Sequence, residues 1–302
     1  MKLATVAAAL LVCAMASAAT AQERPSGPWF YGLQAAALYQ GQSDLDNGTG
    51  HFSMTRAFIQ PSVGYAFDRK NRVSLSLGFG QNKYDFGGGA LLGGGEPWNR
   101  IWDYRVSTPI FFEATEKVTG IVIPSVRWNA ESGADQGDGR TQGVLAGASY
   151  RFSENLSIGP GLGWFSQLGS GSSVFPILLI DWNVTEKLNL STGQGLAASQ
   201  GPGLTLSYAL RDDWKVGLTG RYEKVRFRLD DSGPARDGIG QDTSFPLLAS
   251  IEYSPSPTFS ASVFAGAELG GELRLRDRSG DTLTKSDYDA APLIGFILRA
   301  RY

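Results

Sequence analysis

The chain has 302 residues, of which 27 are basic and 29 are acidic, and its net charge is −2. A charge this small gives no electrostatic footprint for nucleic acid, so no nucleic-acid partner is expected. No run of 18 apolar residues follows the amino-terminal segment, so membrane-spanning helices are not expected either.

Residues 1–21 have the pattern of a secretory signal peptide. Lys2 precedes an apolar run from Leu3 to Met15, and Ala19-Thr20-Ala21 forms an A-x-A cleavage site. The single cysteine, Cys13, follows a valine where a lipoprotein signal requires a small residue, so a lipid anchor is not expected. The folded domain is therefore predicted to occupy residues 22–302.

Six short polar turns divide this domain. They lie at 68–71, 115–117, 153–155, 185–187, 211–213 and 255–257. Longer loops rich in Gly, Asp and Ser alternate with them, at roughly 41–53, 83–100, 131–140, 167–173, 199–203, 230–242 and 277–288. This alternation is typical of the periplasmic and extracellular ends of an outer-membrane barrel.

The segments between turns and loops predict fourteen β-strands. Their limits are 28–40, 54–67, 72–82, 101–113, 118–130, 141–152, 156–166, 174–184, 188–198, 204–210, 214–229, 243–253, 259–276 and 289–302. Because the loop between 188–198 and 204–210 is short, twelve strands is the alternative. The predicted fold class is all-β, a transmembrane antiparallel up-and-down barrel.

Alternation within these strands separates an apolar face from a polar one. In 243–253 the predicted outward set is Phe245, Leu247, Ala249, Ile251 and Tyr253. In 259–276 the outward set runs from Phe259 and is expected to include Leu273 and Leu275. The segment 222–228 changes phase near its middle, which predicts either a bulge or a strand that has left the bilayer.

Aromatic residues of outward parity gather near the short turns and predict a periplasmic belt. Its members are Trp29, Phe67, Phe112, Phe152, Trp182, Trp214, Tyr253, Phe259 and Tyr302. A looser set near the opposite ends comprises Tyr39, Phe79, Tyr104, Trp128, Trp164 and Tyr222. Aromatic rings favour membrane interfaces, whereas a soluble β-sandwich, the competing fold, does not need aromatics at its strand ends.

Charged residues of inward parity are predicted to line the lumen. The candidates are Arg105, Arg127, Arg151, Arg221, Glu268, Glu272, Arg274, Arg299 and Arg301. One interpretation is a basic-leaning pore that favours anions; the other is an interior of paired Arg and Glu that stiffens the wall. Parity alone leaves both open.

The final strand resembles the closing strand of bacterial outer-membrane β-barrel proteins. Ile294, Phe296, Leu298, Ala300 and Tyr302 share one parity, and the chain stops on an aromatic ring. The resemblance is to a broad, porin-like group of unassigned role and covers residues 28–302. It implies a place in the outer membrane of a Gram-negative cell, contact with lipid and lipopolysaccharide, and recognition by the barrel assembly machinery through this strand.

Three loops contain residues of types that could serve a further role. The glycine-rich run 87–95 could fold into the mouth with Leu91 and Leu92 as a constriction, or could be an external loop. His51 and Ser53 lack an orienting third group, so no catalytic residues and no enzyme activity are expected. The acidic loop 131–140 lacks EF-hand spacing, so no metal or other cofactor is expected.

Three functions remain from the sequence. The leading one is a passive pore for small hydrophilic solutes with a mild anion preference. The second is a non-conducting structural or adhesive barrel. The third is a conduit for apolar molecules, against which stands the short segment 22–27 before the first strand, too short for a plug. The oligomeric state and the solute are not specified by any motif.

Overall fold

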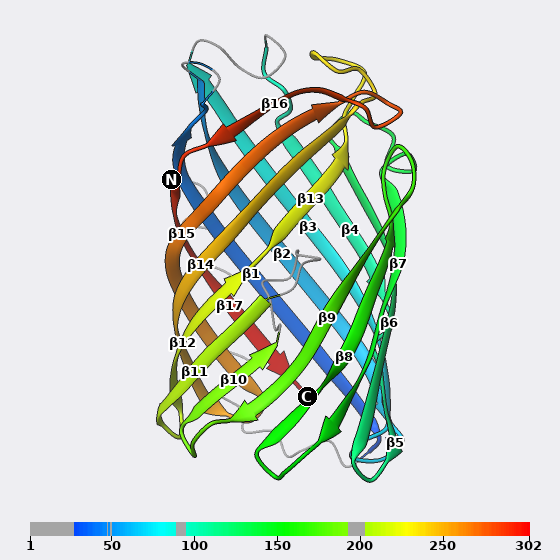
Figure 1. The fold of residues 1–302 in the computed structure, drawn as a ribbon, viewed down its shortest axis with the longest axis vertical. Helices are drawn as coiled ribbons and strands as arrows, with labels where there is room; N and C mark the ends of the chain where they lie inside the picture. The colour runs from blue at the N-terminus through cyan, green and yellow to red at the C-terminus, as the bar shows by residue number, and fades with distance from the viewer. Residues whose placement is uncertain (1–26, 47, 49, 89–94, 193–202) are drawn as a thin grey trace.

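The computed structural model describes residues 27–46, 48, 50–88, 95–192 and 203–302. All regular structure in these residues is β-strand, and the strands form one closed antiparallel ring (Figure 1). Among the described residues no helix is long and apolar enough to cross a membrane. The predicted signal peptide, residues 1–21, lies outside the described residues.

The ring begins with β1 and closes where β1 pairs with the last strand, Gly32 opposite Arg301. In chain order the first elements are β1 (Trp29–Asp44), β2 (Gly50–Ala66), β3 (Arg72–Gly88), β4 (Arg100–Ser107), β5 (Ile110–Thr115), β6 (Val118–Glu131), β7 (Arg140–Arg151), β8 (Leu156–Ser166) and β9 (Ser172–Asn183). The rest are β10 (Leu188–Thr192), β11 (Gly203–Arg211), β12 (Trp214–Arg221), β13 (Glu223–Arg228), β14 (Ile239–Ser256), β15 (Phe259–Arg276), β16 (Thr282–Tyr288) and β17 (Ala291–Arg301).

Three pairs of elements, β4 with β5, β12 with β13 and β16 with β17, are single crossings of the barrel interrupted by a short break. The predicted count of fourteen crossings is therefore confirmed, and the alternative of twelve is wrong. The break between β4 and β5 falls at Thr108 and Pro109, since proline has no backbone N–H for the ladder.

Short and long connections lie at opposite ends, as predicted. The short turns are closed by side chains; Asp68, for example, accepts backbone N–H groups from Lys70 and Asn71 at 2.7 and 2.8 Å. We call the half of the barrel near these turns the lower half, because it lies at the bottom of Figure 1. The half beneath the long connections is the upper half.

Several strands extend farther into the upper half than the sequence predicted. Gly50–Phe52 and the end of β3 continue the β2–β3 ladder to Gly88, and β16 occupies most of the predicted loop 277–288. Backbone pairing continues there because each N–H and C=O still needs a partner. The upper ends of these strands therefore enclose an interior volume that the sequence analysis assigned to loops.

The exterior of the ring is apolar. Large hydrophobic side chains on its outer face are exposed on many strands, among them Leu77, Leu162, Val174, Leu206, Leu218, Ile251 and Val263. Leaving so much apolar area in water would be unfavourable at roughly 25 cal/mol per Å². A closed ring of strands with an apolar outer face is the form in which β-structure spans a membrane.

Candidate functional site

The lower half of the barrel contains a cavity of about 480 Å³, which we call the lower cavity. Its lining comes from β9 to β12, β14, β15 and β17, and is mostly polar. Polar members are Asp181, Asn189, Ser191, Thr192, Thr205, Ser207, Lys215, Thr219, Arg221, Ser250, Glu252, Ser262 and Arg299. Alternation along each strand turns these groups inward while the apolar neighbours face outward.

Charges in the lower cavity are mixed and partly paired. Arg299 lies 3.4 Å from Glu252, and Asn189 donates to Asp181 at 2.8 Å. Lys215 sits opposite Glu252 in the β12–β14 register. With Arg221 at its upper end, the lining holds three cations and two carboxylates among the described residues. The lower cavity is thus a polar, slightly basic chamber.

Packed aromatic side chains fill part of the upper half of the interior. The aromatic plug consists of Phe52 on β2, Tyr84 on β3, Trp98 just before β4, Phe227 on β13 and Tyr288 on β16, all at most 4% exposed. The Trp98 ring contacts the Phe227 ring at 5.1 Å and the Tyr84 ring at 5.8 Å, both edge to face. Edge-to-face contacts are the favoured geometry for aromatic pairs. The plug fixes the segment before β4 inside the mouth.

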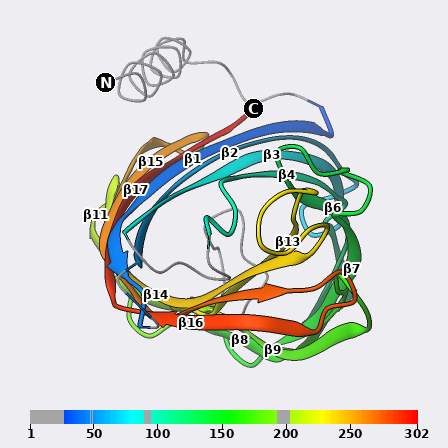
Figure 2. The same cartoon turned by 90° about the horizontal axis from the view of Figure 1, so that it is seen from above.

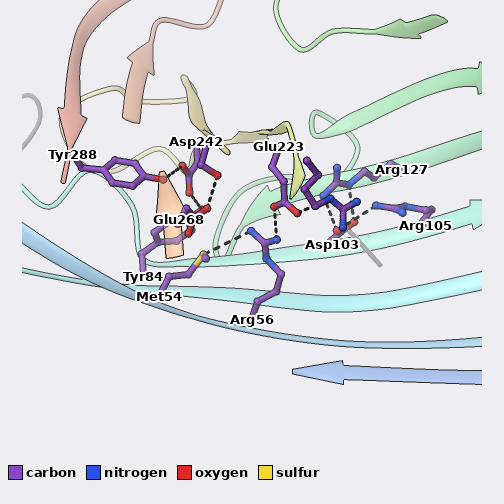
Figure 3. Close-up of polar contacts among 12 residues, drawn as sticks. Met54, Arg56, Tyr84, Asp103, Arg105, Arg127, Glu223, Asp242, Glu268 and Tyr288 are labelled. Carbon is purple, nitrogen blue, oxygen red and sulfur yellow. Dashed lines mark hydrogen bonds and ion pairs between the residues drawn. The ribbon is translucent and has the colours of Figure 1, made fainter. Parts of the chain in front are cut away.

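Beside the plug lies a layer of buried ions, the ionic layer (Figure 3). Arg56 lies 3.1 Å from Glu223, and Arg221 approaches the same carboxylate at 3.5 Å. Arg127 donates two hydrogen bonds to Asp103, at 2.8 and 2.7 Å, and Arg105 approaches Asp103 at 3.8 Å. Buried charges need such partners because desolvation costs several kcal/mol per ion.

A third polar group joins the plug to the wall. The hydroxyls of Tyr84 and Tyr288 donate to the two oxygens of Asp242, at 2.9 and 3.0 Å (Figure 3). The Ser244 hydroxyl donates to Glu268, which is 2% exposed. These contacts bridge β3, β14, β15 and β16, so the upper interior is held by hydrogen bonds as well as by packing.

The strand β13 explains why the segment 222–228 changes phase. Both faces of β13 are at least half-buried, it pairs with β14 on one side, and Arg228 forms a parallel bridge with Ala130 of β6. Seen from above, β13 lies inside the outline of the ring, beside β6 (Figure 2). Val225 and Phe227 therefore face the packed core. The predicted bulge is wrong, because the β12–β14 and β13–β14 pairings keep one register.

In β15 the positions that face inward change from even to odd numbers at Gly270, whose φ is +57°. Before it, Phe264 and Glu268 are buried; after it, Leu273 and Leu275 are buried, at 0% and 1% exposure. The prediction that Leu273 and Leu275 face outward is wrong, because a register shift in the β14–β15 ladder moves the odd positions to the inner side.

The predicted lumen residues fall into three groups. Arg105, Arg127 and Arg221 belong to the ionic layer, Glu268 lies beside it, and Arg299 lines the lower cavity. Glu272 and Arg274 pair with each other on the face of β15 opposite Leu273. Arg151 and Arg301 are exposed at the lower rim.

The predicted aromatic belt residues all lie at the lower ends of their strands. Those exposed by 38% or more are Trp29, Phe67, Phe112, Phe152, Trp182, Tyr253 and Tyr302. Trp214 and Phe259 are half-buried, and the Trp214 ring contacts that of Tyr253 at 4.8 Å.

The other loop residues are accounted for as follows. Leu91 and Leu92 lie outside the described residues. His51 is paired in the β1–β2 and β2–β3 ladders, opposite Asp44 and Gly87. In the loop 131–140, Glu131 accepts the Asn99 backbone N–H and Asp138 pairs with Arg278, so these carboxylates point to different partners.

Sequence reasoning missed the aromatic plug. Phe52 and Met54 share the parity of Arg56, and Tyr84 shares that of Asn82, so large apolar side chains stand on the face expected to be polar. That mismatch was the available signal of a filled interior. Trp98 carried no periodic signal, because it lies outside any strand.

No family model matches the sequence, and no curated protein matches it. Solved structures of similar fold include the Pseudomonas putida toluene transporter TodX, with 10% identity, a TM-score of 0.47, and coverage of 92% of this chain and 90% of that one. An outer-membrane channel from Pseudomonas putida F1 has 10% identity and a TM-score of 0.44 over 94% and 98%. The translocator domain of the autotransporter NalP from Neisseria meningitidis has 13% identity and a TM-score of 0.40 over 99% and 98%.

The chain itself is an outer-membrane β-barrel. Its antiparallel strands close into a ring, its outer face is apolar and its interior is polar in the lower half. These are the properties that define barrels of the bacterial outer membrane.

Proposed function

We propose that this barrel is a passive outer-membrane pore of low conductance for small hydrophilic solutes, with a mild anion preference. The observation that carries the proposal is the lower cavity, a polar chamber of about 480 Å³ built from seven strands of the wall. A barrel with only a structural role has no need of a hydrated chamber of this size, because side chains could fill it.

The aromatic plug supports a low conductance rather than a wide opening. Its rings occupy the upper interior above Arg221, where the lower cavity ends. On this side of β13, a solute would have to pass between these rings and the ionic layer. Flow therefore depends on side-chain displacement in the upper half, and the plug is the element that limits it.

The anion preference follows from the lower-cavity lining. The lining carries three cations, Lys215, Arg221 and Arg299, against two carboxylates, Asp181 and Glu252, among the described residues. Glu223 lies outside the lining and is shared between Arg221 and Arg56, so it does not cancel this excess. One excess cation in a narrow, low-dielectric chamber raises the local concentration of anions. The preference is expected to weaken at high salt because of screening.

Planar-bilayer recording of the purified full chain tests the proposal. The wild-type protein is expected to give small conductance steps, and Trp98→Ala to give steps several-fold larger, because it removes the ring between Tyr84 and Phe227. Trp164→Ala is the matched control, since this tryptophan is 41% exposed on the outer face and its loss should leave the steps unchanged.

Two outcomes would overturn the proposal. The pore is refuted if neither the wild-type protein nor Trp98→Ala gives steps at any voltage while both remain folded. The anion preference is refuted by a cation-selective reversal potential in a salt gradient. If both parts hold, Lys215→Gln should reduce the anion selectivity while leaving the step size close to that of the wild-type protein.

A further inference from the structure

A second cavity, of about 420 Å³, lies on the other side of β13 from the aromatic plug; we call it the upper cavity. Its lining comes from β6 to β9, from the connection between β8 and β9, and from the residues between Arg221 and Arg228. Unlike the lower cavity, it combines an apolar wall with unneutralised cations. It shares no lining residue with the lower cavity, on which the proposed pore function rests.

The apolar wall consists of Phe165, Leu168, Phe175 and Pro176. The rings of Phe165 and Phe175 are parallel, 5.9 Å apart with 7° between their planes. Each lies directly over a glycine: a Cβ at Gly143 would be 2.1 Å from the Phe165 ring, and one at Gly163 would be 2.4 Å from the Phe175 ring. The two rings form a flat platform of the kind on which an aromatic or alkyl group packs.

The opposite wall of the upper cavity is cationic. Lys224 has no carboxylate within 4.0 Å among the described residues, and the Arg226 guanidinium donates to the amide oxygens of Gln241, at 2.7 Å, and Gln167. These oxygens are neutral, so they leave the positive charge in place. Arg127, also in the lining, is neutralised by Asp103.

The cationic wall continues beyond the cavity on the same face of the β13–β15 sheet. The Gln241 side-chain oxygen accepts from Arg226 and also from Arg276, whose guanidinium nitrogen lies 3.4 Å from that oxygen. Arg274 lies two residues before Arg276 in β15, on the same face. Glu272 is the carboxylate of this face, and it is shared between Arg274 and Lys285. A fold does not gather uncompensated cations in a partly buried site without cost, and an anionic ligand would remove that cost.

We propose that the upper cavity binds a small amphipathic carboxylate. Its carboxylate would lie between Lys224 and Arg226, and its aromatic or short aliphatic body would pack on Phe165 and Phe175. The volume of the cavity is in the range of small-molecule sites, which are largely apolar with a few placed polar groups. A charge-assisted pair with Arg226 would orient the ligand.

The test uses 1-naphthoate as the probe, with the full-length barrel in detergent and fluorescence anisotropy as the readout. Saturable binding is expected for 1-naphthoate, and at least tenfold weaker binding for neutral 1-naphthamide. The Lys224→Gln/Arg226→Gln double variant should weaken naphthoate binding at least tenfold without altering naphthamide binding. Phe175→Leu should weaken both probes. Arg278→Gln, which removes an exposed arginine from an upper loop, is the matched control and should bind naphthoate as the wild-type protein does.

Competitors separate the possible forms of the ligand. Displacement of naphthoate by phenylacetate alone supports an aromatic carboxylate, and displacement by octanoate as well supports an aliphatic one. The proposal is overturned if inorganic phosphate competes as well as either, because the apolar wall then contributes nothing. It is also overturned if folded Lys224→Gln/Arg226→Gln protein, verified by its gel mobility before and after heating, binds naphthoate normally. Since no conductance is measured, failure of the pore proposal would not affect this result.

Discussion

The lower half of the barrel interior is a polar cavity of about 480 Å³, whereas the upper half holds the aromatic plug and the ionic layer on one side of β13 and the upper cavity on the other. The same strands pass through both halves, so the difference does not come from the ring itself. It comes from three features of the upper half. The segment with Trp98 enters the mouth, β13 lies inward against β6, and the inward positions of β15 change at Gly270. In the lower half the side chains of regular strands set the lumen. In the upper half, departures from regular strand geometry close it.

The largest expected difference between the halves is in their ion pairs. Glu223→Gln removes the carboxylate shared by Arg56 and Arg221, whose side chains are 6–7% exposed, and should lower the free energy of unfolding by about 3–5 kcal/mol. Glu252→Gln breaks the Arg299 pair in the lower cavity, with side chains 21–26% exposed, and should cost less than about 1 kcal/mol. Denaturant unfolding of both variants in lipid vesicles checks this, and equal losses would contradict the division into halves.

The next effect concerns the two hydroxyls on Asp242. Tyr84→Phe or Tyr288→Phe leaves this buried carboxylate with one tyrosine donor and should cost about 1.5–3 kcal/mol each. The double variant should depart from additivity because both hydroxyls serve one group. Tyr39→Phe, at a ring 49% exposed, is the control, expected within about 0.5 kcal/mol of the wild-type protein. Denaturant unfolding midpoints of the two single variants, the double variant and the control check this. A loss for Tyr39→Phe equal to that for Tyr84→Phe would contradict the prediction.

A smaller effect tests how tightly the walls are built. Gly143→Ala places a Cβ 2.1 Å from the Phe165 ring and 2.4 Å from a backbone oxygen, so it should cost about 1–3 kcal/mol. Gly220→Ala in β12 meets nothing closer than 3.5 Å and should be nearly neutral. Urea unfolding of both variants measures the two losses of stability. Equal losses would contradict the prediction, because the Phe165 ring would then have room to move away from the added methyl group.

The smallest effect lies at the lower rim. The Asn71 side-chain amide, at 2.6 Å, and two backbone N–H groups hold the pKa of Asp68 below its usual range. A lowered folded pKa means that the stabilisation is present above the unfolded pKa and is lost as pH falls through the folded value. Asp68→Asn should therefore reduce the acid sensitivity of the unfolding midpoint slightly between neutral pH and about pH 3. An unchanged pH profile would show that this turn contributes nothing to acid stability.

Much of the lower half could be predicted from the sequence. Short turns, strict alternation and aromatic residues at strand ends are local features, and Arg299 was placed on the inward face by parity alone. The alternation of inward and outward side chains can be followed wherever a strand is regular and remains in the wall of the ring. For the same reason, the prediction for Leu273 and Leu275 failed once the strand passed Gly270.

The upper half was not predictable in this way, because its arrangement depends on contacts between residues far apart in the chain. Arg56 and Glu223 are separated by 167 positions, and Tyr84 and Asp242 by 158. Parity shows that a side chain points inward, but not which side chain it meets or at what depth. The upper cavity has the same origin, since Phe175 and Arg226 face one another only when β13 crosses the lumen.

The sequence by itself determined the barrel, its fourteen crossings and the end at which the short turns lie, because these depend on the two-residue period and on local turn chemistry. Only the tertiary structure decided that the lower lumen is hollow, that the upper lumen is plugged and that a second, cationic cavity lies behind β13. The physical reason is that filling an interior is a matter of packing between distant strands. The phase change in 222–228 signals an irregular strand, but it does not show that Arg228 meets Ala130.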